Sequence, residues 1–395
     1  MLALRLARGA HPLVLLRRLL VTAAAAGTGF LLLCTLGYAM GHPGAGSVLR
    51  LAWCAAPLAA TVHLAVAVAR TDPATRPRPG LSAVGLGPGR LMVIAAVSTA
   101  VACTLGSMLA LLFFLHLRGD ISGLPFDGAA AELLAADRPL PLAAALTLLA
   151  LVPIAASVAS ALVLRPRPAR PTEESTGPAA PADPDRPDAP APAPSGLPWG
   201  VALLAAGLAV ETYASRAGGS DGLPLPGGLT EPPAGVLAGW ALTALGLALA
   251  GPGLTYLCGR LLQMVRPGAM RLLAGRVLME EARRIGRPLG VVCAVASGAY
   301  AAAVISSSGS PALPGTGPLT VLGSLLVAGC AVLTLATAAV EARQSRAHTS
   351  AALLRLGAPA SMLRGSAALR AGALFVVFGP LTWAVAELAA LPLVP

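Results

Sequence analysis

The sequence contains no lysine, because all 28 of its basic residues are arginine. A chain without lysine has no Walker A lysine for nucleotide phosphates, and no lysine for Schiff-base or general-base chemistry. Charge of either sign is scarce, at 11% of 395 residues against roughly 25% in ordinary soluble domains. So few charged residues cannot cover the surface of a soluble protein of this length, and the composition therefore excludes that class.

Apolar residues take the place of the missing charges, since 56% of the chain is hydrophobic and the mean hydropathy is +0.76. They gather in runs long enough to cross a bilayer, which takes roughly 20 residues at about 1.5 Å of helix rise per residue. The sequence predicts an all-α, polytopic transmembrane helical bundle with about nine spans. The predicted spans are 19–40, 48–69, 91–117, 141–164, 197–214, 235–258, 288–307, 318–340 and 367–391.

The first run follows a basic leader that contains Arg5, Arg8, Arg17 and Arg18. Its apolar part is about 20 residues long, which exceeds the roughly 7–15 residues of a signal-peptide core. The run also ends without a clear small-x-small cleavage site. We therefore expect it to be retained as a transmembrane helix.

The placement of arginine predicts the orientation of the chain, because cytoplasmic loops carry an excess of basic residues. With the N-terminus in the cytoplasm and the sides alternating, only four of the 28 arginines fall outside. Of the other 24, all but Arg370 lie in the leader and the inner loops, and Arg370 lies near the inner end of the last predicted span. This bias predicts a multi-pass protein of the cell (cytoplasmic) membrane. The four outer arginines are Arg50, Arg118, Arg138 and Arg216.

No set of side chains with the spacing of a catalytic or metal site stands out. The six cysteines lie inside apolar runs without CxxC spacing, which is typical of small hydrophobic residues in helices. We expect no enzymatic activity, no metal and no cofactor. Aromatics are only 4% of the chain and the arginines lie in short loops, so we expect anionic lipid headgroups, and no nucleic acid, as partners of these charges. The cysteines are Cys34, Cys54, Cys103, Cys258, Cys293 and Cys330.

Two histidines and two carboxylates lie in or at the ends of predicted spans: His63, His116, Glu211 and Glu387. An ionisable group at membrane depth is a candidate functional residue. Histidine near a helix end, and carboxylates near the outer face, are explained more simply as interfacial hydrogen-bonding groups. An ion-coupled carrier needs carboxylates near the midplane of several helices, and only Glu387 approaches that position.

A proline-rich segment of mixed charge, 165–196, divides the chain. Such a composition prevents a packed core, and we expect a disordered or polyproline-like cytoplasmic linker. Four predicted spans precede it and five follow it.

Two predicted inner loops share a pattern. Each leaves an apolar helix, passes through arginines and a short amphipathic stretch, reaches a Gly and Pro turn and enters another apolar helix. Internal repeats on this scale are common in membrane transport proteins. A shift of 270 residues places Val84 on Leu354, Leu86 on Leu356 and Gly87 on Gly357.

The second loop, which reads EARQSRAHTSAALLRLGAPASMLR from Glu341, resembles the FtsX/MacB-like permease domain of ABC transporters. The resemblance covers residues 338–387. The first copy matches less closely, because Leu81 to Gly87 lacks the arginine and the alanine that follows glycine. Amphipathic arms before the first helix of each family domain resemble residues 4–8 and 271–287.

The resemblance implies a permease subunit that carries no ATPase of its own. It divides the chain into a first four-helix permease half, the linker, two linking transmembrane helices and a second permease half (1–164, 165–196, 197–258 and 259–395). The second half departs from the family pattern, because its final helix and a sizeable outer domain are missing.

A separate ABC ATP-binding subunit would dock on the cytoplasmic face, with short amphipathic helices of the two loops acting as coupling helices. A homodimer or a second permease is a further partner that the resemblance leaves open, as it does the substrate. The alternative is a non-transporting membrane scaffold or regulator derived from such a permease. The implied coupling residues are Leu81, Val84, Leu86, Gly87, Arg343, Arg346, Leu354, Arg355, Leu356, Gly357 and Arg364.

Overall fold

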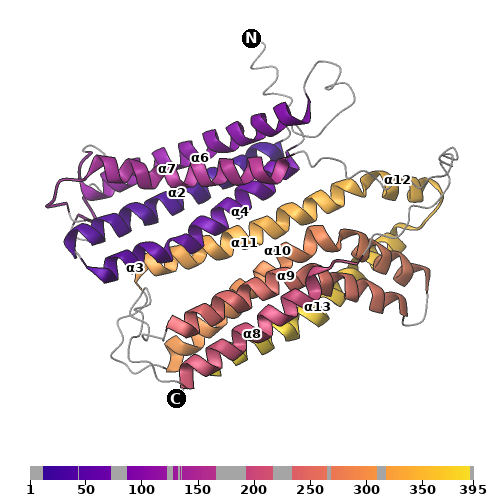
Figure 1. Cartoon of the computed structure of the whole chain (residues 1–395). Coiled ribbons are helices and arrows are strands. Elements are labelled where there is room, and N and C mark those ends of the chain that lie inside the picture. Colours follow the sequence, from indigo (N-terminus) through magenta and orange to yellow (C-terminus); the bar gives the residue numbers. More distant parts are fainter. Residues whose placement is uncertain are drawn as a thin grey trace, which may run out of the picture.

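The computed structural model shows eleven helices within the part of the chain that it describes (Figure 1). The described residues are 12–42, 44–72, 87–121, 128–131, 134, 136–165, 193–216, 234–264, 268–308 and 317–391. The helices are α2 (Pro12–Gly41), α3 (Ala45–Trp53), α4 (Ala55–Thr71), α6 (Pro88–Arg118), α7 (Leu142–Leu164), α8 (Gly196–Arg216), α9 (Ala234–Met264), α10 (Ala269–Ser308), α11 (Pro318–Ser345), α12 (Ala347–Arg355) and α13 (Ala360–Ala390).

Within the described residues, nine helical segments are long and apolar enough to cross a membrane. They correspond one for one to the nine predicted runs, with α3 and α4 together forming the second span. The predictions of an all-α polytopic bundle and of a multi-pass membrane protein are confirmed. Most of the predicted linker, residues 166–192, lies outside the described residues.

The first helix group consists of α2, α4, α6 and α7, which pack against one another. Its core contains Val21, Leu64, Cys103 and Val152, all with exposed fractions of 3% or less. The hydroxyls of Thr28 and Thr61 hydrogen-bond across α2 and α4 at 2.8 Å. Such bonds between buried hydroxyls hold helices together where lipid offers no hydrophobic driving force.

The second helix group consists of α8, α9, α10 and α13, and its most extensive contact joins α9 to α10. Glycine allows their backbones to meet. A Cβ atom on Gly286 of α10 would lie 2.5 Å from the Cα of Pro252 in α9, and one on Gly275 would lie 2.5 Å from the carbonyl oxygen of Gly259. Close backbone approach at small residues is the usual way in which helices associate tightly in lipid.

α11 joins the two groups (Figure 1). It packs on α4 and α2 on one side and on α10 on the other, and its Cys330 belongs to the core of the first group. The helix follows α10 in the sequence, yet much of its buried surface faces the N-terminal half. The assignment of 1–164 and 259–395 to two permease halves stays a prediction.

Several helices are longer than a bilayer requires, among them α10 and α11. The 40 residues of α10 and the 28 residues of α11 extend to about 60 and 42 Å at about 1.5 Å per residue, against a hydrocarbon core of about 30 Å. α10 also continues without a break through Pro288. The predicted arm at 271–287 and the predicted span at 288–307 are therefore parts of one continuous helix.

Candidate functional site

The end of the bundle at which α12 lies, here called the α12 end, carries the second predicted coupling loop. α12 is a nine-residue helix between the long helices α11 and α13 (Figure 1). It follows α11 after the single residue Arg346, which keeps helical backbone angles. A connection of one residue makes α12 a stiff extension of a spanning helix.

The turn after α12 depends on Gly357. This residue has φ +90°, in the left-handed region that glycine adopts without steric cost. Its N–H donates to the carbonyl of Leu354 at 3.1 Å, and the N–H of Ala358 donates to the carbonyl of Leu353 at 3.0 Å. These bonds close the helix C-terminus in a Schellman-type cap. The predicted Gly turn is therefore present, and it directs the chain from α12 into α13.

Large apolar side chains of this segment are exposed. Leu354 has an exposed fraction of 48% and Leu356 one of 85%, and Arg355 beside them is also exposed. Since α11 is longer than the hydrocarbon core is thick, the segment extends beyond the lipid tails. An exposed leucine outside the lipid tails has no apolar environment of its own.

Arg346 contacts α10 instead of pointing away from the chain. Its Nε lies 2.8 Å from Oε1 of Glu281, whose side chain is 11% exposed. The same Nε–H donates to the carbonyl of Ala342 at 2.9 Å, so the contact with Glu281 is an ion pair and not an aligned hydrogen bond. This pair fastens the α11–α12 junction to the long helix α10.

The other implied coupling residues are distributed as follows. Arg343 is exposed near the end of α11, and Arg364 is exposed in the second turn of α13. Gly87 precedes α6, where Pro88 is the first helical residue. Leu81, Val84 and Leu86 lie outside the described residues. The structure thus brings the residues of the second loop to the α12 end.

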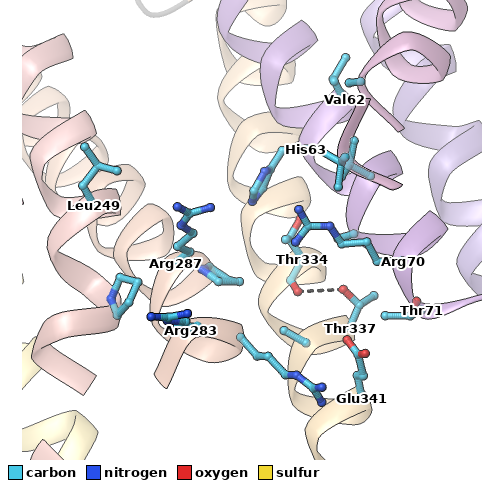
Figure 2. Close-up of a pocket in the computed structure, with 18 of the residues that line it drawn as sticks. Val62, His63, Arg70, Thr71, Leu249, Arg283, Arg287, Thr334, Thr337 and Glu341 are labelled. Carbon is cyan, nitrogen blue, oxygen red and sulfur yellow. Dashed lines mark hydrogen bonds between the residues drawn. The ribbon is translucent and has the colours of Figure 1, made fainter. Parts of the chain in front are cut away.

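Sequence reasoning missed a cavity of about 950 Å³ between the two helix groups (Figure 2). Residues of α4, α7, α9, α10 and α11 line it, together with residues 194–196 at the start of α8. In Figure 2, Arg70 and His63 from the first group and Arg287 from the second direct their side chains toward a common space. The only signal in the sequence was the position of Arg70 and Arg287 at the ends of apolar runs, which predicted topology alone.

The cavity is charged near the α12 end and apolar farther in. Arg287 directly precedes the apolar run 288–307, and Arg70 directly follows the run 48–69. At about 1.5 Å per residue these runs extend over about 30 and 33 Å, which places both arginines at the edge of the hydrocarbon core. His63 lies two helical turns, about 10 Å, deeper than Arg70.

Among the described residues, no group of three or more His, Cys, Asp or Glu side chains could hold a metal ion. All six cysteines are buried, and none forms a disulfide. Comparisons with models of known families, with curated proteins and with solved structures found no match. What the sequence and the structure establish together is the class: the chain is a polytopic, all-α membrane protein.

Proposed function

We propose that the chain is a permease-type subunit that receives motion from a separate cytoplasmic ATPase through α12. The observation that carries this proposal is the exposed pair of Leu354 in α12 and Leu356 at its C-cap, on a short helix that lies between two spanning helices. Such coupling requires exposed apolar side chains on an element that is stiffly joined to transmembrane helices. That element must also lie outside the lipid tails, where a soluble partner can contact it. α12 meets each part of that requirement.

The surroundings of α12 also suit an acidic, grooved partner. Arg343, Arg355 and Arg364 are exposed on this segment, so an apolar groove with carboxylates on its rim would be complementary to it. The ion pair of Arg346 with Glu281 adds a route by which displacement of α12 reaches α10. The resemblance of 338–387 to FtsX/MacB-like permeases supports the same role.

The proposal places the α12 end in the cytoplasm of the cell and the N-terminus on that side. Only Arg50, Arg118, Arg138 and Arg216 then face outward, as the excess of basic residues in cytoplasmic loops requires. Fusion of a reporter to residue 395 tests this orientation, because nine spans put the two chain ends on opposite sides. An inside location of both ends would contradict it.

The substitution Leu356→Glu is expected to abolish association with the ATPase while leaving the membrane domain folded. Leu356 is 85% exposed, so the change removes no packing within the chain, and it would bury a carboxylate in the apolar groove. The measurement is co-purification in detergent with a co-expressed ABC ATP-binding subunit, together with the ATPase activity of the complex. We expect a loss of about tenfold or more, the factor that corresponds to about 1.4 kcal/mol.

The matched control is Leu272→Glu, which changes an exposed leucine (45%) on α10 and leaves α12 intact. Retention of the ATPase by both variants would contradict the coupling role of α12. The second candidate, a scaffold or regulator derived from a permease, is favoured by the short segment of nine residues between α10 and α11, which leaves no room for an outer domain. That candidate predicts no ATP-dependent substrate movement in vesicles that contain the complex.

A further inference from the structure

The cavity between the two helix groups combines a basic mouth with an apolar interior. Four arginines line it, against one carboxylate, that of Glu341. The rest of its lining includes small and aliphatic side chains. These are Ala59, Val62, Val66, Ala159, Val163 and Leu249.

The arginines are arranged to meet an anion from two sides. Arg70 belongs to α4 and Arg287 to α10, and Figure 2 shows both side chains directed into the cavity. Within the described residues, no salt bridge joins Arg283, Arg284 or Arg287 to a carboxylate, although Arg276 and Arg346 of the same region have such partners. Guanidinium groups bind phosphate oxygens in a bidentate manner, which makes convergent arginines suitable for a phosphate group.

We infer that this cavity binds an anionic phospholipid, with its phosphate between Arg70 and Arg287 and an acyl chain along the apolar walls. The level of the two arginines, at the edge of the hydrocarbon core, is the level at which lipid phosphates lie in a bilayer. Basic pockets between transmembrane helices are known to hold acidic headgroups. The volume of about 950 Å³ is enough for a headgroup and the first part of a chain.

A soluble phosphate compound shares the headgroup chemistry but not the apolar part. It would be held by the arginines alone and would leave the walls formed by Val62, Val163 and Leu249 without a partner. A phospholipid occupies both parts of the cavity, and this is why the lipid is the ligand that the cavity favours. It would also fill the space between the two helix groups, so its binding would stabilise their relative position.

The test is native mass spectrometry of the full chain in detergent, titrated with phosphatidylglycerol or phosphatidylcholine. We expect phosphatidylglycerol to bind more tightly, by about tenfold or more, since its headgroup is a net anion, whereas the arginines repel the choline ammonium of phosphatidylcholine. The double variant R70Q/R287Q is expected to lose that preference. Equal binding of the two lipids to the unchanged chain would overturn the inference.

The matched control is R276Q, which removes one arginine from α10 at a position 67% exposed and outside the cavity lining. If R276Q weakens phosphatidylglycerol binding as much as R70Q/R287Q does, binding depends on the overall positive charge of the protein and not on this cavity. The assignment of the cavity as the lipid site would then be wrong. Both variants are compared only as monodisperse protein in size-exclusion chromatography.

A second variant separates the lipid from a soluble anion and does not depend on the folding of R70Q/R287Q. The substitution A159L fills the apolar interior and leaves every arginine in place. It is expected to weaken phosphatidylglycerol binding by about tenfold, from the loss of space for the acyl chain, and to leave binding of glycerol phosphate unchanged. Unchanged lipid binding in A159L, or displacement of the lipid by equimolar glycerol phosphate, would overturn the inference. This outcome is independent of whether an ATPase docks on α12.

Discussion

The substitution Gly286→Leu is expected to remove almost all folded protein from the membrane fraction. A Cβ atom at this position would lie 2.5 Å from the Cα and 2.6 Å from the backbone nitrogen of Pro252. Backbone atoms cannot rotate away as a side chain can, so α9 and α10 would have to separate. Overpacking of this kind costs about 1–3 kcal/mol or more, a large fraction of the total stability of a protein.

The matched control is Gly298→Leu in the same helix, because a Cβ atom there meets no other atom within 4 Å. The alanine variants sharpen the comparison. Alanine favours helix over glycine by about 1 kcal/mol, so Gly298→Ala is expected to be neutral or stabilising, while Gly286→Ala is expected to destabilise. The measurement is the yield of monodisperse protein and its thermal unfolding midpoint in detergent. Equal behaviour at the two positions would show that α9 and α10 do not meet at Gly286.

The second large effect is expected at the ion pair of Glu281 and Arg346. Replacement of either residue by glutamine should loosen the junction between α11 and α12, because it leaves the other charge largely buried without its partner. For a pair with exposed fractions of 11% and 31% we expect a loss of about 1–2 kcal/mol, between exposed and fully buried pairs. Faster hydrogen exchange in peptides that cover residues 342–358 measures this loosening.

The control for this pair is Glu280→Gln, since Glu280 is 61% exposed and contacts only the exposed Arg276 within the described ion pairs. It is expected to change exchange in α12 little. The reversed pair, Glu281→Arg with Arg346→Glu, should restore much of the protection that each single reversal removes. Failure of the reversed pair to do so, or an equal effect of Glu280→Gln, would mean that the pair does not hold α12 against α10.

The first substitution tests the folding of the second helix group, and the second tests the contact between α12 and α10. The substitution at Gly286 tests whether α9 and α10 pack in the second helix group. The loss of folded protein should be seen without any partner subunit. The pair of Glu281 and Arg346 concerns transmission from α12 to α10. Under the proposed function its disruption should reduce ATP-dependent activity more than it reduces the yield of folded protein.

The candidate site was predictable only in the part that is local in sequence. The amphipathic stretch at 351–356 and the glycine after it were visible as a pattern, and the structure shows a helix with a left-handed glycine at its end. The partner of Arg346 was not visible, because Glu281 is 65 residues away in the chain. The convergence of Arg70 and Arg287 was hidden for the same reason.

The sequence by itself determined the class of the protein, the number of spans and their approximate limits. These depend on runs of apolar residues about 20 long, a property that each segment carries alone. Even the short run 197–214 appears as α8.

Only the tertiary structure decided how the spans are combined. In lipid, a surface that faces acyl chains and a surface that packs on another helix are both apolar, so hydropathy does not say which helices are neighbours. For this reason nothing in the sequence indicated that α11 packs on α4 and α2. The cavity between the two helix groups, with arginines at its mouth, likewise depends on which helices are neighbours and is visible only in the tertiary structure.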